Sequence, residues 1–176
     1  MSWTGCFPEL HGFVLLAPER LDRAVGGAAT GRDLLTLFST TELGDRVAAE
    51  GVAIPLMNPE AAYYRVLIRH PSTPSPWGRP CRSWPGWVLG TTTGSLVFCG
   101  AGALTCWDPD DARHRRAQVP PGWYTVRIDG HLLDGVPDDA AYEFVLTPTD
   151  DRPTLRARLD EDLGIPGLDG SGDDPA

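Results

Sequence analysis

The 176-residue sequence contains no lysine, and all 15 of its basic residues are arginines. This absence excludes the lysine of a phosphate-binding P-loop, a Schiff-base lysine and a lysine general base. Long apolar runs are absent too, since the longest strongly apolar run, Phe13 to Ala17, is far too short to cross a bilayer. We therefore predict no membrane partner.

A secretion signal is also missing. Residues 1–4 lack a basic segment followed by an apolar run. We therefore predict a cytoplasmic protein. Its four cysteines, Cys6, Cys81, Cys99 and Cys106, are then expected to be reduced thiols, because disulfides are rare in that compartment.

Metal-binding and catalytic motifs are absent as well. The histidines form no H-x-x-x-H pair, the cysteines form no C-x-x-C pair, and no G-x-S-x-G elbow is present. We predict no metal, no cofactor and no catalytic residue, so an enzyme is the less favoured class. If the chain were an enzyme, its acid–base groups would be Asp129, His131 and Glu143.

The negative charge is concentrated near the end of the sequence. The net charge is −9, yet residues 1–128 hold 11 acidic residues and 12 arginines, whereas residues 129–176 hold 13 acidic residues and three arginines. An acidic protein is poorly suited to bind a phosphate backbone, so we predict no nucleic-acid partner. The charge favours a basic protein partner, because complementary fields speed encounter. The alternative is that this charge only keeps the protein soluble.

Turn-forming residues indicate the fold class. The 20 glycines and 17 prolines are too many for a helical bundle, and 41% hydrophobic residues are enough for a packed core. We predict a mostly β protein, a β-sandwich or partly open barrel of two similar β-units with short helices and a C-terminal helix. Residues 1–167 are expected to form one globular domain, and residues 168–176 a disordered acidic tail.

Apolar runs and turn signals place the expected elements. Short helices are predicted after Pro18 and over residues 40–50, and a C-terminal helix from Asp151 on, where Leu155, Leu159 and Leu163 recur every four residues. A hairpin is expected around residues 100–102. Strands are predicted over residues 13–16, 33–38, 52–57, 63–68, 95–99, 103–107, 123–129 and 142–146.

Two pairs of these strands are related by the same offset of 60 residues. Residues 36–38 align with 96–98, and residues 63–68 align with 123–128. The match favours duplicated units over residues 10–70 and 87–148, joined by a proline-rich crossover at 71–86. Two unrelated strand pairs are the alternative.

Tryptophan and arginine are concentrated in or beside this crossover. Both residue types dominate binding hot spots, and prolines hold a loop in one shape. We predict that these side chains, together with three acidic residues, contact a partner. The alternative is that the tryptophan rings fold inward and cover an open end of a sheet. The predicted partner-binding residues are Trp77, Trp84, Trp87, Arg79, Arg82, Asp134, Asp138 and Asp139.

The sequence contains one basic cluster. Arg113, Arg115 and Arg116 flank His114, and guanidinium groups are good bidentate donors to anions. The cluster is a candidate anion-binding site. The alternative is a solvated loop between two turns.

The stretch Pro120-Pro121-Gly122-Trp123-Tyr124-Thr125-Val126-Arg127-Ile128 follows a strand and an acidic turn. This pattern is similar to small bacterial β-sandwich proteins of the competence protein J type and to immunity proteins of polymorphic toxin systems. The resemblance covers residues 95–148 and implies a cytoplasmic protein that inhibits a nuclease or a toxin by binding it. No catalytic residue is implied.

These observations favour a non-enzymatic protein-binding module of the inhibitor or immunity type, whose acidic surface meets a basic partner such as a nuclease or toxin. One alternative is a small enzyme or small-molecule-binding β-barrel with a pocket lined by Trp, Tyr and Arg. A structural subunit of a homo-oligomer, such as a homodimer, is the other.

Overall fold

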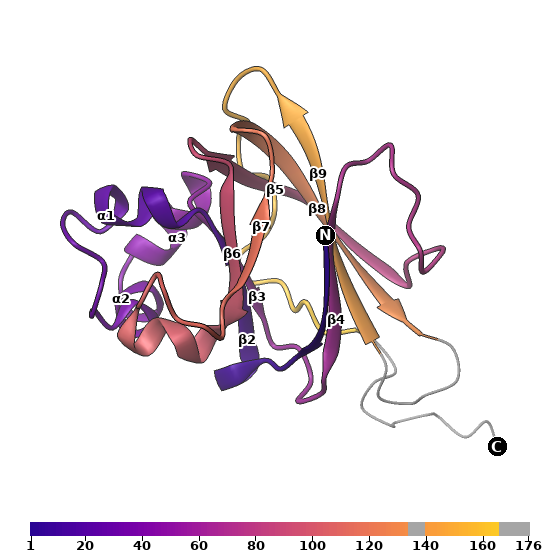
Figure 1. Cartoon of the computed structure of the whole chain (residues 1–176), viewed down its shortest axis with the longest axis horizontal. Helices are drawn as coiled ribbons and strands as arrows, with labels where there is room; N and C mark the ends of the chain where they lie inside the picture. Colours follow the sequence, from indigo (N-terminus) through magenta and orange to yellow (C-terminus); the bar gives the residue numbers. More distant parts are fainter. Residues whose placement is uncertain (134–139, 166–176) are drawn as a thin grey trace.

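Two packed β-sheets with short helices on one side make up the structure, a computed structural model that describes residues 1–133 and 140–165 (Figure 1). One sheet has five strands in the order β1-β4-β9-β8-β5, and the other has four in the order β3-β2-β6-β7. Only the β4–β9 pair is parallel. In the described part of the chain neither sheet closes into a barrel, so the predicted mostly β, sandwich-like class is confirmed.

The elements have the following bounds. The strands are β1 (Ser2–Cys6), β2 (Gly12–Leu16), β3 (Ala53–Met57), β4 (Tyr64–Arg69), β5 (Arg82–Thr91), β6 (Ser95–Gly100), β7 (Arg115–Gln118), β8 (Gly122–Leu132) and β9 (Ala140–Thr149). The helices are η1 (Glu9–His11), η2 (Pro18–Arg20), α1 (Leu21–Ala24), α2 (Leu34–Thr40), α3 (Leu43–Ala49) and η3 (Ala101–Cys106), where η marks a 3-10 helix.

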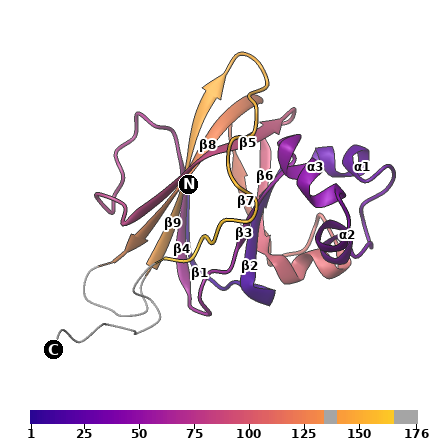
Figure 2. The same cartoon turned by 180° about the vertical axis from the view of Figure 1, so that it is seen from behind.

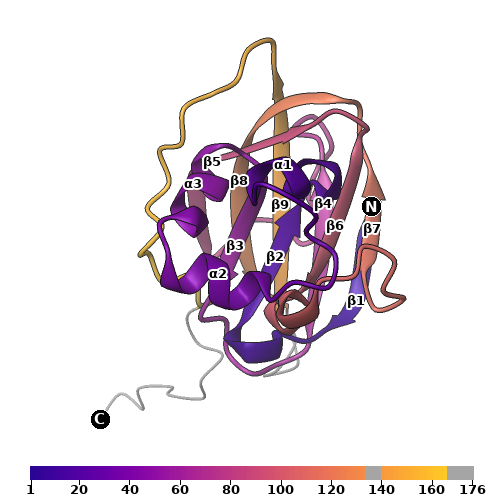
Figure 3. The same ribbon diagram turned by 90° about the vertical axis from the view of Figure 1, so that its left-hand side faces the viewer.

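Both faces of β2, inside the four-stranded sheet, are buried, which explains its unbroken apolar run. Phe13 and Leu15 belong to the core between the two sheets, whereas Val14 and Leu16 belong to a second core beneath the helices. A strand covered on both faces is apolar at every position. Figure 3 shows α1, α2 and α3 lying over this sheet.

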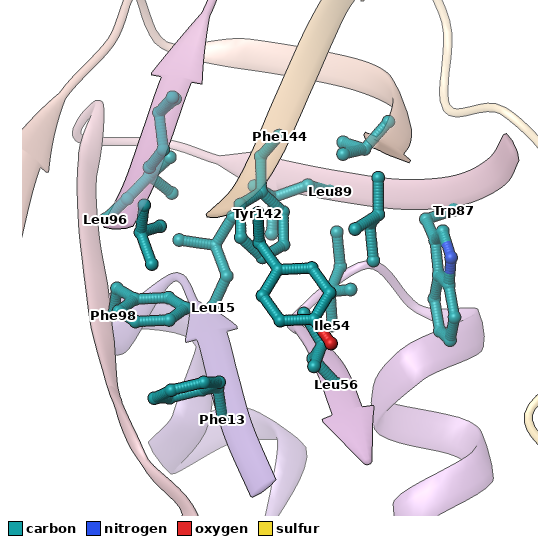
Figure 4. Packing of buried hydrophobic residues seen from close by; sticks show 14 of the residues in the cluster. Phe13, Leu15, Ile54, Leu56, Trp87, Leu89, Leu96, Phe98, Tyr142 and Phe144 are labelled. Carbon is teal, nitrogen blue, oxygen red and sulfur yellow. The ribbon is translucent and has the colours of Figure 1, made fainter. Parts of the chain in front are cut away.

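Aromatic rings fill the core between the sheets (Figure 4). The ring of Phe13 meets Tyr64 edge-on at a centroid distance of 5.7 Å, and Phe98 meets Phe144 at 5.9 Å. Edge-to-face packing of this kind adds to the stabilisation from buried area. Leu89 from β5 and Leu56 from β3 lie in the same layer.

Trp84 and Trp87 lie in this core rather than on the surface. Each is only 2% exposed, and each faces inward from β5. The prediction that they contact a partner is therefore wrong for these two rings, and the alternative of inward-folded rings holds. β5 accepts Pro85 because it is an edge strand with a register shift between the two tryptophans.

Two predicted strands are helical in the structure. Residues 33–38 form most of α2, because the Asp33 carboxylate caps the helix by accepting from the Thr36 amide at 2.9 Å. Residues 103–107 fall largely in η3, so the hairpin predicted around residues 100–102 is wrong. β6 lies between β2 and β7 and is antiparallel to both, and β7 contains Arg115 and Arg116.

The C-terminal helix prediction is also wrong. Residues 150–165 form an extended strap, visible in yellow in Figure 2, that passes the edge strand β5. Leu155, Ala157 and Leu159 are partly buried against the core while the residues between them are exposed, which is the alternation of an extended chain. A spacing of four residues fits this period of two as well as one helical turn. The predicted tail at 168–176 lies outside the described residues.

The two aligned pairs of the predicted repeat differ in secondary structure. Residues 36–38 lie in α2 while residues 96–98 lie in β6, so the first pair does not form equivalent elements. The second pair lies in β4 and β8, which are strands of one sheet. Both sheets combine strands from the two halves of the chain.

A substitution at Gly86 tests the contact between β5 and the strap. The Gly86 carbonyl accepts from the amides of Arg156 and Ala157, and a Cβ at Gly86 would lie 2.8 Å from the Ala157 nitrogen. Gly86 also has a φ of +95°, and Gly78, which has open space around it, has a φ of +73°. We expect Gly78→Ala to lower the free energy of unfolding by about 1–2 kcal/mol through backbone strain. Gly86→Ala should lower it by about 1–3 kcal/mol more through overpacking.

Urea denaturation of both variants measures this difference. Equal losses in the two variants would show that the strap does not pack tightly on β5.

Candidate functional site

The acid–base candidates of the sequence meet on the outer face of the five-stranded sheet. Residues two apart in a strand share a face, so β8 places Asp129 and His131 on one side of the sheet. Asp129 lies directly opposite Glu143 of β9 and Ser83 of β5. Asp129, His131 and Glu143 are all buried, with exposed fractions of 1% or less.

Glu143 is held by charged and polar neighbours. Arg69 of β4 donates from Nη2 to Glu143 Oε2 at 2.8 Å, and His131 Nε2 lies 3.7 Å from the same oxygen. Burial raises the pKa of Glu143, but His131, Arg69 and Ser75 stabilise the charged form more strongly, so the pKa falls to about 2. The carboxylate is therefore charged at neutral pH.

Asp129 has a separate set of partners. Ser83 donates from Oγ to Asp129 Oδ1 at 2.6 Å, and Arg127 donates to both carboxylate oxygens at 2.8–3.0 Å. Bidentate guanidinium–carboxylate pairs are strong and directional. Both carboxylates of the cluster are thus paired within the chain.

Residues 70–81, which we call the proline loop, pack against this cluster. The Trp77 ring meets the His131 ring at a centroid distance of 5.5 Å, and Arg69 Nη1 donates to the Thr73 carbonyl at 2.8 Å. Figure 1 shows the loop on the side of the sheet that faces away from the helices. Trp77 is thus half-buried against the sheet, whereas Arg79 is exposed.

Four buried polar atoms of this cluster have no hydrogen-bond partner. They are Glu143 Oε1, Arg69 Nε and both ring nitrogens of His131. Each such atom costs about 1–3 kcal/mol, so the cluster does not add to stability through all of its groups. Acid–base chemistry on a substrate would require the proline loop to move, since the three acid–base candidates are inaccessible to solvent.

The basic cluster of the sequence has largely internal partners. Arg113 pairs with Asp111 at 2.6 Å, and Arg116 lies 3.8 Å from Asp110 and donates to the Pro109 carbonyl. Arg115 lies near the Cys6 thiol. A free anion would compete here with three carboxylates, those of Asp110, Asp111 and Glu9, so the geometry does not favour the anion-binding prediction.

The remaining predicted contact residues are Arg79, Arg82 and three aspartates. Arg82 stacks over Trp84 at 5.3 Å and lies 3.5 Å from Glu161 of the strap. Asp134, Asp138 and Asp139 lie outside the described residues. Within the described part of the predicted set, Trp84 and Trp87 are buried, whereas Arg79 and Arg82 are exposed.

Sequence reasoning missed four exposed apolar side chains on two chain segments that the Phe7–Tyr63 ring contact and the β2–β3 pairing bring side by side; we call them the apolar rim: Phe7, Leu10, Met57 and Tyr63. The Phe7 and Tyr63 rings are 5.3 Å apart, and Met57 pairs with Gly12, two residues after Leu10. The only available signal was the pair of turns at Phe7-Pro8 and Asn58-Pro59, which bring residues 7–12 and 57–63 to one end of the sandwich.

Leu10 is the unusual member of the apolar rim. It has a left-handed backbone, with φ 52° and ψ 42°, and is 58% exposed. For a residue with a Cβ this conformation costs about 1–2 kcal/mol. An exposed leucine side chain returns little of that cost within the isolated chain.

Helices that could span a membrane and groups of metal-binding side chains are both absent from the described residues. No helix within 1–133 or 140–165 is long and apolar enough to cross a membrane. In the same ranges, no three His, Cys, Asp or Glu side chains are grouped as metal ligands. All four cysteines belong to these ranges and are free.

Comparison with known proteins found no matching family model and no curated protein with a matching sequence. One solved structure similar to this chain is ComJ, the inhibitor of the DNA degrading activity of NucA from Bacillus subtilis. The TM-score is 0.49 at 12% identity, covering 85% of this chain and 98% of ComJ. Another is the crocagin biosynthetic gene J protein, with a TM-score of 0.43 at 15% identity over 82% of this chain and 94% of that chain. The competence protein J type, which the sequence resembles, is thus also among the similar structures.

Replacing Glu143 tests the buried ion pair. Glu143→Gln leaves the Arg69 guanidinium without a charged partner, and we expect the free energy of unfolding at pH 7 to fall by about 3 kcal/mol or more. The folded-state pKa of Glu143 lies below its ordinary value of 4.5, so the unfolded chain takes up the proton first as pH falls. Wild type should therefore lose stability between pH 4.5 and about 2, and the variant should lose less of it.

Glu161→Gln is the matched control, because it makes the same change in the exposed pair with Arg82. We expect a loss of less than about 1 kcal/mol in urea denaturation. Similar losses in the two variants would mean that Glu143 is solvated.

Proposed function

We propose that this chain is a non-enzymatic protein-binding module of the inhibitor or immunity type, which acts in the cytoplasm and docks on a basic protein such as a nuclease or toxin. The observation that carries the proposal is Leu10, an exposed leucine in a strained left-handed conformation within the apolar rim. Strained residues persist where the surrounding structure holds them, and they cluster at functional sites.

The apolar rim has the chemistry of a docking surface. Tyr63 is 66% exposed and is supported by the Phe7 ring, so it presents a fixed aromatic face. Aromatic side chains and methionine are enriched in interfaces. Burying one leucine side chain contributes about 1.5–3 kcal/mol, which offsets the backbone strain at Leu10 only when a partner covers it.

The acid–base groups support binding over catalysis. Asp129 and Glu143 are buried and paired with arginines, and His131 is covered by Trp77. Side chains that perform acid–base catalysis must be able to reach the reacting group of a substrate. In this arrangement the three candidates stabilise or orient the sheet and the proline loop rather than meet a substrate.

The charge of the chain supports a basic partner. The net charge is −9, and Glu60 is exposed beside the apolar rim. In the proposal Asp134, Asp138 and Asp139 add to this negative field. Complementary charge mainly accelerates encounter, while the apolar contact sets the lifetime of the complex.

Leu10→Gly separates binding from folding. Glycine adopts the left-handed conformation freely, so we expect the free energy of unfolding to stay constant or rise by up to about 1 kcal/mol. Loss of the side chain should weaken the affinity by about 10- to 100-fold. The measurement uses the protein that immobilised wild-type chain captures from its own cell lysate, purified and titrated against both forms.

Thr154→Asp is the control, since Thr154 is exposed on the strap outside the apolar rim. It should bind as wild type does. A Leu10→Gly variant with unchanged affinity would contradict the proposal. Wild type that elutes as a dimer while Leu10→Gly elutes as a monomer would instead assign the apolar rim to a homodimer.

Salt tests the electrostatic part of the proposal. Raising ionic strength from about 0.05 M to about 0.5 M shortens the screening length, and we expect the association rate with the captured partner to fall about tenfold or more. The dissociation rate should change by less than about twofold. Surface plasmon resonance measures both rates, and an association rate independent of salt would rule out a basic partner surface.

A further inference from the structure

A groove of about 600 Å³ lies where η2, α1, α3, the start of β8 and the start of the strap come together. Its size is typical of small-molecule sites. Four of the 15 arginines of this acidic chain line it around one tryptophan: Arg20, Arg23, Arg46, Arg152 and Trp123. The residues that line the groove include none of the apolar rim and none of the buried group Asp129, His131 and Glu143.

Two of these arginines are fixed in place over the indole ring. The Arg20 guanidinium lies 4.6 Å from the Trp123 ring centroid, and that of Arg152 lies 5.8 Å from it. Arg20 Nη1 donates to the Gly51 and Gly90 carbonyls at 3.0 and 3.1 Å. Carbonyl acceptors orient a guanidinium without cancelling its charge, so these contacts prepare the positive groups for an anion.

Gly90 leaves space for the stacked side chains of Arg20 and Trp123 because it has no Cβ. A Cβ there would lie 2.3 Å from the Trp123 ring and 2.5 Å from Arg20 Nη1. Any other residue at this position would push the ring or the guanidinium away. Close stacking of Arg20 on Trp123 therefore depends on this glycine.

The other two arginines are exposed at the groove. The side chains of Arg23 and Arg46 are exposed and have no hydrogen bond or ion pair with any described residue. Of the two carboxylates in the lining, Glu19 accepts from the Thr91 hydroxyl at 2.7 Å and the Thr92 amide at 2.8 Å, which turns it towards the β5–β6 turn. Glu50 is the other, so the four guanidinium groups exceed the carboxylates by two.

We propose that this groove binds a small polyanion that carries two or more linked phosphate groups. Planar guanidinium groups match phosphate oxygens bidentately, and several of them around one groove suit a chain of phosphates better than a single anion. The indole face is covered by guanidinium groups, so the groove recognises the phosphates and not a stacked base. This site is independent of the protein-binding function proposed above.

Isothermal titration calorimetry with inorganic triphosphate tests the proposal. Wild type should bind triphosphate, and the double variant Arg23→Ala/Arg46→Ala should bind about tenfold more weakly or worse, because it loses two charge-assisted contacts with the phosphate oxygens. Since both side chains are exposed and unpaired, the melting temperature should be unchanged. Arg158→Ala, an exposed arginine outside the groove, is the matched control and should bind as wild type does.

Citrate and inorganic monophosphate separate the ligand classes. Both should bind at least tenfold more weakly than triphosphate at equal ionic strength. Citrate that binds as tightly as triphosphate would overturn the assignment to phosphate. Equal triphosphate affinity in wild type and the double variant, with both folded, would overturn the site itself.

Discussion

The apolar contact between the two sheets is the interaction on which the rest of the structure depends. It joins Phe13, Phe98 and Leu56 of the four-stranded sheet to Tyr142 and Phe144 of the other (Figure 4). Because side chains alternate between faces, fixing these residues inward also fixes which residues face outward. The helices cover the outward face of one sheet, and the proline loop covers part of the outward face of the other.

The two outward faces are covered in different ways. On β2 the outward residues are apolar, and the helices bury them in a second apolar core. On β8 and β9 the outward residues include Asp129, His131 and Glu143, which require partners once the proline loop covers them. Arg69, Arg127 and Ser83 provide those partners, although several polar atoms remain unpaired. The one cluster of acid–base groups in the described residues is therefore internal.

The surfaces proposed for binding lie at the ends of the sandwich, where the sheets no longer cover one another. At one end the turns that enter β2 and β4 expose Leu10 and Tyr63. Elsewhere the junction of α1, α3 and the strap collects four arginines around Trp123. Apart from Trp123, these groups lie in turns, short helices and the strap, where the backbone is free of the alternation that the core imposes on the strands.

The sequence by itself determined the elements whose pattern has a single physical interpretation. The apolar run at 13–16 and the β-rich runs at 63–68 and 123–129 are strands, and the mostly β class follows from them together with the many glycines and prolines. Prediction from the sequence failed where one residue pattern fits two different secondary structures. The four-residue spacing of Leu155 and Leu159 suits both a helix and an extended strap, and residues 33–38 suit a strand until Asp33 caps them as a helix. The sequence also named Asp129, His131 and Glu143 together, as the acid–base groups of the enzyme alternative. Only the tertiary structure decided that Trp84 and Trp87 face the core, that the acid–base group is buried, and that Leu10 and the arginine groove are exposed. The reason is that exposure depends on which distant segment covers a face, and pairing between strands 70 or more residues apart, such as β2 with β6 and β4 with β9, carries no local signal.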